Sequence, residues 1–90
     1  MTRVTLLTKA DCGLCDQAKD VLHRLSSEFD VVVETVDTAT ERGQAMAQQA
    51  GMVFPPGVLV DGEPFSYGRL SERKLRRTLR RVGAPATPQS

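Results

Sequence analysis

The chain has 90 residues and a formal net charge of +1, with 40% hydrophobic residues, no Trp, one Tyr and three Phe. This length allows one small domain with a modest core, and the scarcity of aromatic residues predicts that the core is aliphatic. No apolar run approaches the ~20 residues that a membrane-spanning helix needs, which excludes a membrane protein. Because the start also lacks the pattern of a secretory signal, we expect a cytoplasmic location, where a cysteine pair is more often catalytic than structural.

The charges are unevenly distributed along the chain. Residues 1–68 carry five Lys or Arg against ten Asp or Glu, whereas residues 69–90 carry seven against one. An acidic body of net charge −5 is therefore followed by a basic segment of net charge +6.

The first half predicts a strand, a helix and a second strand. The run over 3–8 is β-branched and apolar, which is typical of a buried strand, and a short turn follows it. Residues 13–29 then predict a helix, and residues 30–37 a Val-rich second strand, so that the unit implies a parallel pair with a right-handed crossover. One face of this helix is apolar, with Ala18, Val21, Leu22, Leu25 and Phe29 at helical spacing.

A second helix is predicted from Thr38 to Ala50. Thr38 and Glu41 fit a capping box, and Gly51 is placed to end the helix. Its inner side is weakly apolar, with Ala45, Met46 and Ala50.

The last part predicts an antiparallel hairpin and a third helix. Asp61-Gly62 lies between two short extended runs and favours a type I′ turn. Pro55-Pro56 before the first run marks a strand boundary, because proline cannot donate to a sheet ladder. Ser71 is the expected N-cap of the last helix, with Leu75, Leu79 and Val82 on its inner side and Gly83 at its end. Residues 1–83 are thus one domain, and residues 84–90 are predicted to be a disordered tail.

The candidate site is the pair Cys12 and Cys15, which lies where the first strand passes into the first helix. The first N–H groups of a helix lack intrahelical partners and favour negative charge, so a thiolate at Cys12 is stabilised there. Cys15 lies one turn further on and can reach back to it. We therefore predict a nucleophile and its resolving partner, with Gly13 keeping the turn open and Leu14 offering an apolar contact beside the sulfur. Asp11 is interpreted as a helix-cap residue.

Two other interpretations of the cysteines stay open. They could be inert buried residues, since free Cys packs as a small hydrophobe. They could also hold a metal ion or an iron–sulfur cluster, but structural zinc needs four ligands and His23 is the only His of the chain, well along the helix. A metal centre would therefore need cysteines from two chains, and no metal site is expected within one.

Two segments resemble glutaredoxins. Thr8-Lys9-Ala10-Asp11-Cys12-Gly13-Leu14-Cys15 is similar to their T-K-x-x-C-x-x-C opening, and Pro55-Pro56-Gly57-Val58-Leu59-Val60-Asp61-Gly62 is similar to their V-P-x-x-x-x-[ND]-G segment. The resemblance covers about residues 3–82. It implies an α/β, thioredoxin-like (glutaredoxin) fold with a four-stranded mixed sheet and three helices, in the order β-α-β-α-β-β-α.

The resemblance also implies roles for several residues. Pro56 would be a cis-proline facing the cysteines, the backbone of Pro55 would pair with a bound peptide or thiol, and Lys9 would meet the carboxylate of glutathione. Lys9 is equally well interpreted as a solvated turn residue. Two departures from the family are Gly13-Leu14 in place of Pro-Tyr and Ser66–Ser71 in place of the paired glycines that hold glutathione.

The leading hypothesis is a thiol-disulfide oxidoreductase of the glutaredoxin-like kind that acts, as a monomer, on a disulfide-bearing protein or a small thiol. No cofactor is expected to be bound, and a low-molecular-weight thiol, glutathione or another, is the expected cosubstrate. The reductase or thiol that donates electrons is not identified by the sequence.

The competing hypothesis is a binding module. The seven basic residues of the last segment could meet an acidic partner or nucleic acid. A solvated helix face is favoured instead, because the opposite face is committed to the core and no aromatic residue is interleaved for stacking, so nucleic acid is not an expected partner.

Overall fold

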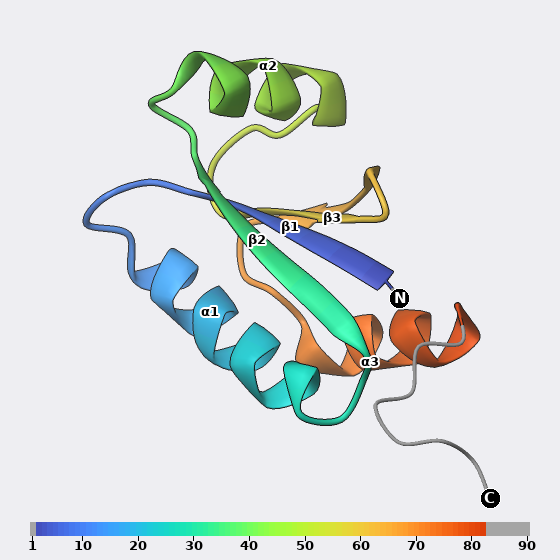
Figure 1. The fold of residues 1–90 in the computed structure, drawn as a ribbon. Helices are drawn as coiled ribbons and strands as arrows, with labels where there is room; N and C mark the ends of the chain where they lie inside the picture. The colour runs from blue at the N-terminus through green and yellow to red at the C-terminus, as the bar shows by residue number, and fades with distance from the viewer. Residues whose placement is uncertain (1, 83–90) are drawn as a thin grey trace, which may run out of the picture.

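Four strands and three helices make up the computed structural model, which describes residues 2–82 (Figure 1). Their order along the chain, and the fold that it builds, confirm the predicted β-α-β-α-β-β-α arrangement. The elements are β1 (Thr2–Thr8), α1 (Gly13–Ser26), β2 (Val31–Asp37), α2 (Glu41–Ala50), β3 (Gly57–Val60), β4 (Glu63–Tyr67) and α3 (Glu72–Arg81).

The sheet is mixed and has the strand order β2-β1-β3-β4. β1 pairs in parallel with β2, as the strand-helix-strand unit predicted, and antiparallel with β3, which in turn pairs antiparallel with β4. The pairing places Leu7 opposite Gly57, and Gly57 opposite Tyr67. The C-terminal ends of β1 and β4 therefore meet the start of β3 at one edge of the sheet, which we call the site edge.

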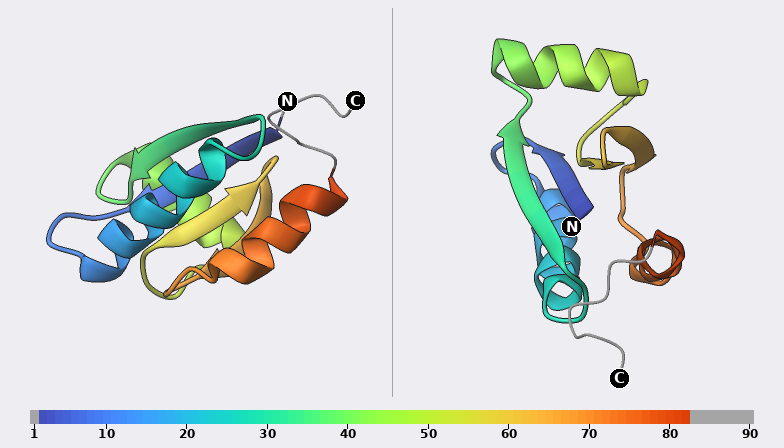
Figure 2. Two further views of the ribbon diagram at one scale, coloured as in Figure 1. Left: turned by 90° about the horizontal axis from the view of Figure 1, so that it is seen from below. Right: turned by 45° about the vertical axis from the view of Figure 1, so that its right-hand side comes forward.

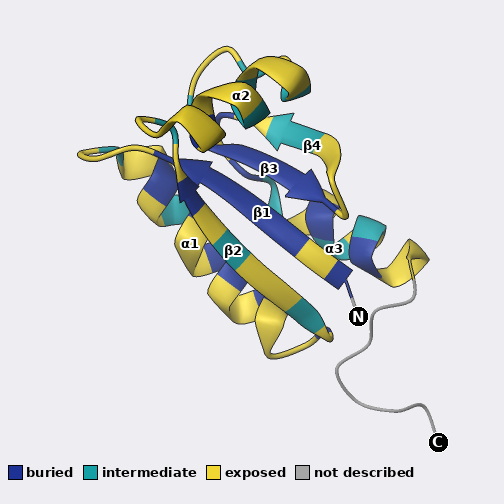
Figure 3. Ribbon diagram, turned by 45° about the horizontal axis from the view of Figure 1, so that its top comes forward, coloured by how far each residue is buried: buried dark blue, intermediate teal, exposed yellow. Residues whose placement is uncertain are grey.

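Helices cover both faces of the sheet. α1 and α3 lie on one face and α2 on the other (Figure 2). The larger core cluster lies under α1 and α3, and the smaller one, Leu7, Val36 and Leu59, lies under α2. β1 and β3 are buried along almost their whole length, whereas most of β2 is exposed (Figure 3). Apart from Phe29, the large buried side chains of the core are aliphatic, as the composition predicted. The most deeply buried are Leu6, Leu7, Leu25, Leu70, Leu75, Leu79, Val4, Val21 and Val58.

α1 ends three residues before the predicted position 29. The Ser27 hydroxyl and backbone N–H both donate to the carbonyl of Arg24, and the hydroxyl of Ser26 donates to that of His23. Such side-chain bonds compete with the helical ladder, so the helix stops at Ser26. Phe29 is nevertheless only 7% exposed, because the turn returns its side chain to the core.

The N-cap of α2 is Thr40, and the capping box predicted from Thr38 is wrong. The backbone of Thr38 still donates to the carbonyl of Thr8, at 2.8 Å, so it continues the strand pairing. Asp37 then closes a turn by accepting from the N–H of Ala39, which moves the helix start by two residues. The hydroxyl of Thr40 accepts from the N–H of Gly43 at 2.9 Å.

The inner side of α2 also differs by one residue from the prediction. Met46, Ala47 and Ala50 pack against the smaller core cluster, while Ala45 is exposed. Gly51 ends α2 with a positive φ of 68°, as predicted.

The hairpin and the last helix follow the sequence signals closely. Asp61 and Gly62 both have positive φ, 50° and 83°, as a type I′ turn requires. Ser71 caps α3 by accepting from the N–H of Lys74. Val82, predicted on the inner side, is 46% exposed because it follows the last helical residue.

The remaining predictions on the chain end lie outside the described residues, since Gly83 and residues 84–90 fall there. Within residues 2–82, no helix has the length and apolarity needed to cross a lipid bilayer.

Candidate functional site

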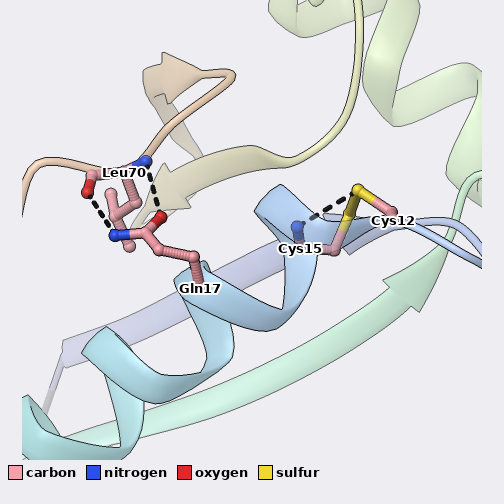
Figure 4. Close-up of a disulfide and its surroundings, with 4 residues drawn as sticks. All are labelled: Cys12, Cys15, Gln17 and Leu70. Carbon is pink, nitrogen blue, oxygen red and sulfur yellow. Dashed lines mark hydrogen bonds between the residues drawn. A yellow bond between two sulfur atoms is a disulfide. The ribbon is translucent and has the colours of Figure 1, made fainter.

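Cys12 is the N-cap residue of α1, and its sulfur replaces the oxygen that caps most helices. Its backbone is extended, with φ −122° and ψ 106°, and its Sγ accepts a hydrogen bond of 3.1 Å from the N–H of Cys15. The Cα atoms of Cys12 and Cys15 lie 5.2 Å apart, and their sulfurs form a disulfide (Figure 4). The predicted pairing of the two cysteines is therefore present at the predicted helix start.

The two sulfur-bearing residues differ in accessibility. Cys12 is half-buried, whereas Cys15 is 1% exposed and belongs to the buried face of α1. Cys12 is thus the more accessible of the two cysteines.

The turn before the cysteines is exposed. Asp11 has a positive φ of 54° and does not cap the helix, a role that Cys12 fills, so the interpretation of Asp11 as a cap is wrong. Lys9 is exposed in the same turn. Gly13 is also exposed, with no atom within 4 Å of the position of an added Cβ, and the side chain of Leu14 is 36% exposed.

Pro56 lies at the same edge of the sheet as this turn. The Pro55-Pro56 peptide bond is cis and immediately precedes β3, whose first residue pairs with Leu7 near the end of β1. Pro56 is almost completely buried, and its carbonyl accepts a 2.7 Å hydrogen bond from the N–H of Gly68. The cis-proline that the resemblance implied is therefore present, and Pro55, half-buried, stands beside it.

An exposed aromatic pair adjoins this proline. Phe54 and Tyr67 pack edge to face with ring centroids 5.3 Å apart, and they are 49% and 45% exposed. Gly68, with a φ of 80°, lies directly under the Phe54 ring, where an added Cβ would be 2.9 Å from a ring carbon. Sequence reasoning missed this pair, because the two rings are 13 residues apart and only the sheet brings them together.

Gln17 is a second residue that sequence reasoning missed. Its side-chain amide donates to the carbonyl of Leu70 at 3.0 Å and accepts from the N–H of Leu70 at 3.2 Å (Figure 4). The helix that carries the cysteines thereby holds the segment between β4 and α3. Only its position on α1, two residues after Cys15, could have suggested a role.

Ion pairs link α3 to α1 and to the segment that follows α1. Arg24 contacts Glu72 at 2.7 Å, and Arg76 contacts Glu28 at 2.8 Å and Glu72 at 3.2 Å. The hydrogen bond from Arg24 lowers the pKa of Glu72, and the same bond raises the pKa of Arg24. The pKa of Arg76 is raised chiefly by its hydrogen bond to Glu28. Arg76, one of the seven basic residues of the last segment, therefore forms ion pairs within the fold.

Within residues 2–82, no three His, Cys, Asp or Glu residues come together in an arrangement that could hold a metal ion. His23 is exposed in the last turn of α1. The two cysteines alone are too few for tetrahedral zinc.

The structure is similar to solved thioredoxins. It matches a mutant thioredoxin from Halobacterium salinarum NRC-1 with a TM-score of 0.71 and 22% identity, covering 97% of this chain and 78% of that one. It also matches the oxidized form of mitochondrial thioredoxin 3 from Saccharomyces cerevisiae, with a TM-score of 0.67 and 18% identity, over 89% and 77% of the two chains. These likenesses show the thioredoxin-like fold.

Sequence comparisons find relatives with a higher sequence identity to this chain. The uncharacterized protein Rv0508 from Mycobacterium tuberculosis is 36% identical over 87 residues, which cover 92% of this chain and 90% of the relative. The uncharacterized protein Mb0520 from Mycobacterium bovis matches with the same figures. The model of the glutaredoxin-like domain family (DUF836) matches residues 3–80. Since this match takes in both cysteines and all but the end of α3, the chain belongs to the glutaredoxin-like (DUF836) family.

Proposed function

We propose that this protein is a thiol-disulfide oxidoreductase in which Cys12 is the nucleophile and Cys15 the resolving thiol. The observation that carries the proposal is the placement of the Cys12 sulfur at the N-cap of α1, where it accepts the N–H of Cys15. In the reduced protein the same N–H and the helix dipole would stabilise a thiolate at this position. The half-buried state of Cys12 and the burial of Cys15 support the division of roles.

The reaction consists of two exchanges. The Cys12 thiolate attacks one sulfur of a substrate disulfide, forming a mixed disulfide and expelling the other substrate sulfur as a thiolate. Cys15 then loses its proton to solvent or to that thiolate, attacks Cys12 Sγ and releases the second substrate sulfur. The substrate gains two electrons, and the protein is left with the Cys12–Cys15 disulfide. A low-molecular-weight thiol or a dithiol reductase would restore the dithiol, and this cycle suits a reducing, cytoplasmic compartment.

The residues around the pair have supporting roles in this proposal. Pro56 and Pro55 would flank the bound substrate, and Gly13 and Leu14 would line the approach to Cys12. Lys9 would attract an anionic substrate from its exposed turn. Glutathione or another small thiol is the proposed cosubstrate, and no bound cofactor is needed because the two sulfurs carry both electrons.

An equilibrium redox titration tests the proposal. The protein would be incubated over a range of potentials set by glutathione and dithiothreitol redox buffers, and the Cys12–Cys15 disulfide followed by thiol trapping and mass spectrometry. We expect a single two-electron couple between about −270 and −120 mV, the range of related motifs. Cys12→Ser and Cys15→Ser are the controls and should form no intramolecular disulfide. If the wild-type protein also forms none across this range, the proposal fails.

A further inference from the structure

Most basic residues of the last segment lie together on the outer face of α3. Six of the seven are exposed, and none of the six forms an ion pair with a carboxylate of residues 2–82. Helical spacing places Arg73, Arg77 and Arg80 on one line along the helix. Leu75 and Leu79, on the opposite face, are completely buried. We call the six exposed cations the basic row: Arg69, Arg73, Lys74, Arg77, Arg80 and Arg81.

The basic row has no role in holding the described fold together, in contrast to Arg76, which forms two ion pairs. Like charges one turn apart on a helix repel each other and destabilise it. Arg77 lies one turn from Arg73 and one turn from Arg81, so the row contains such pairs. An anionic partner would remove this repulsion and gain from the charge of the row.

Carboxylates border the basic row on both sides. On one side lie Glu28 and Glu72, in the ion pairs that link α3 to α1 and to the segment after it. On the other side, Asp61 and Glu63 line a cavity together with Arg81. A flat anionic surface, such as a membrane, would bring its own charge against these carboxylates. A linear polyanion can lie on the row alone, so the narrow shape of the row favours a linear partner.

The composition of the row favours phosphate over the carboxylates of an acidic protein. Five of the six cations are Arg, whose planar guanidinium forms paired hydrogen bonds with phosphate. The centre of a protein–protein interface contains apolar and aromatic side chains, but no large hydrophobic side chain is exposed between residues 69 and 81. Interfaces with nucleic acid are more polar and much more positively charged, as this surface is.

From this arrangement we infer that the basic row binds the phosphate backbone of a nucleic-acid duplex. The five cations within α3 are spread over about 12 Å of its axis, and a duplex of that length carries about seven phosphates. The lack of an interleaved aromatic residue disfavours single strands, which are held by base stacking, but phosphate contacts to a duplex need no stacking. The row leads away from the site edge toward the N-terminal end of β1 (Figure 1), so this binding is separate from the proposed disulfide exchange.

Fluorescence anisotropy of a labelled DNA duplex of about 20 base pairs, titrated with the protein, tests the inference. We expect a dissociation constant of about 10⁻⁶ to 10⁻⁴ M at physiological salt. The logarithm of the affinity should fall linearly with the logarithm of the salt concentration, with a slope of about −4 for four or five phosphate contacts. Two duplexes of different sequence should bind with affinities within about twofold of each other, because phosphate contacts carry no sequence information.

The variant Arg73→Gln/Arg77→Gln removes two charges from the middle of the row. Both positions are exposed and Gln is a good helix former, so the fold should be kept. The variant should bind the duplex at least about tenfold more weakly at low salt, and its salt slope should be smaller by about two. Lys9→Gln/Lys19→Gln is the matched control, because it removes the same number of charges from exposed positions outside α3. Its salt slope should equal that of the wild type.

Three outcomes would overturn the inference. One is no rise in anisotropy at low salt with protein up to about 10⁻⁴ M. A second is an equal loss of affinity in the two double variants, which would show that the charge of the whole molecule, and not the row, attracts the duplex. A third is binding to vesicles of phosphatidylserine and phosphatidylcholine, or to polyglutamate, without binding to the duplex, which would assign the row to a membrane or to an acidic protein. None of these outcomes bears on the redox titration of Cys12 and Cys15.

Discussion

Cys12 combines two tasks that are usually divided between different residues. It is the N-cap of α1 at the end of the loop after β1, and it carries the sulfur that the proposed chemistry needs. An N-cap acceptor satisfies one of the helix N–H groups that otherwise lack a partner, so the sulfur is tied to the backbone of Cys15. In this position the reactive atom cannot be moved without also changing the start of α1.

We expect Cys12 to react with iodoacetamide before Cys15 in the reduced protein at pH 7. The thiolate at the N-cap is favoured by the helix start, and Cys15 is almost completely buried. Mass spectrometry of a quenched time course would give the two rates, with Cys12→Ser and Cys15→Ser as references. Equal rates for the two cysteines would contradict the assignment of roles.

Ser66 has a buried hydroxyl that makes no hydrogen bond within residues 2–82. A buried polar group without a partner is destabilising, so Ser66→Ala should raise the free energy of unfolding by about 1 kcal/mol. Urea denaturation would measure the change. Ser71→Ala is the opposite control, because Ser71 caps α3 and its loss should lower stability by about 1 kcal/mol. A loss of stability in Ser66→Ala would contradict the expectation.

The pairing of α1 with the segment after β4 depends on one side chain. Gln17 makes both of its hydrogen bonds to the backbone of Leu70, one to the carbonyl and one to the N–H. Gln17→Ala would leave two partly buried backbone groups without their partner, and we expect a loss of about 1–3 kcal/mol. Gln48→Ala, at an exposed position of α2, should change stability far less. Hydrogen exchange at the Leu70 amide would localise the effect, and unchanged protection there would contradict it.

The attachment of α3 to α1 should weaken in acid. The pKa of Glu72 is lowered by the hydrogen bond from Arg24, so its contribution to stability is present above the unfolded-state value of about 4.3 and is lost as the pH falls through the lower folded-state pKa. Between pH 5 and about 3 the wild-type protein should therefore lose more stability than Glu72→Gln. Thermal melts across this range would measure it, with Glu63→Gln, an exposed residue of β4, as control. Parallel curves for the wild type and Glu72→Gln would contradict it.

The order of the strands and helices was predictable because its signals are local and agree with one another, whereas the four-stranded mixed sheet was implied by the resemblance to glutaredoxins. The apolar run of β1, the Asp61-Gly62 turn and the Ser71 cap each specify an element within a few residues. The errors arose where tertiary contacts decide. Thr38 looks like a cap in the sequence, but the carbonyl of Thr8 holds its N–H in the sheet.

The candidate site was only partly predictable, because some of its contacts join residues that are far apart in the sequence. Cys12 and Cys15 are three residues apart, so their relation is visible in the sequence. The Phe54–Tyr67 pair and the Gln17–Leu70 bonds join residues that are distant along the chain, and no local pattern marks them. Long-range pairs of this kind become visible only once the strand register is known.

The molecule separates its proposed chemistry from the two positive charges at the end of α3. The turn that carries Lys9 follows the C-terminal end of β1, whereas Arg80 and Arg81 lie in the last turn of α3, close to the N-terminal end of β1 (Figure 1). At physiological ionic strength, charges are screened beyond about 8 Å, so only the charge near Cys12 should affect an approaching substrate. Lys9 is three residues from Cys12, so their Cα atoms are at most about 11 Å apart, a distance close to this screening length.

This arrangement predicts that the rate of reaction with an anionic disulfide depends more on the charge near Cys12 than on the net charge of the molecule. Lys9→Glu should slow the reaction of the reduced protein with the anionic disulfide dithiobis(nitrobenzoate) by several-fold at physiological salt, and leave the rate with uncharged hydroxyethyl disulfide unchanged. Arg80→Glu/Arg81→Glu reverses twice as many charges at the far end of α3 and should alter neither rate. Stopped-flow absorbance would measure the reaction with the anionic disulfide. If the double reversal slowed this reaction as much as Lys9→Glu, the field of the whole molecule would govern the approach, and Lys9 would have no special role.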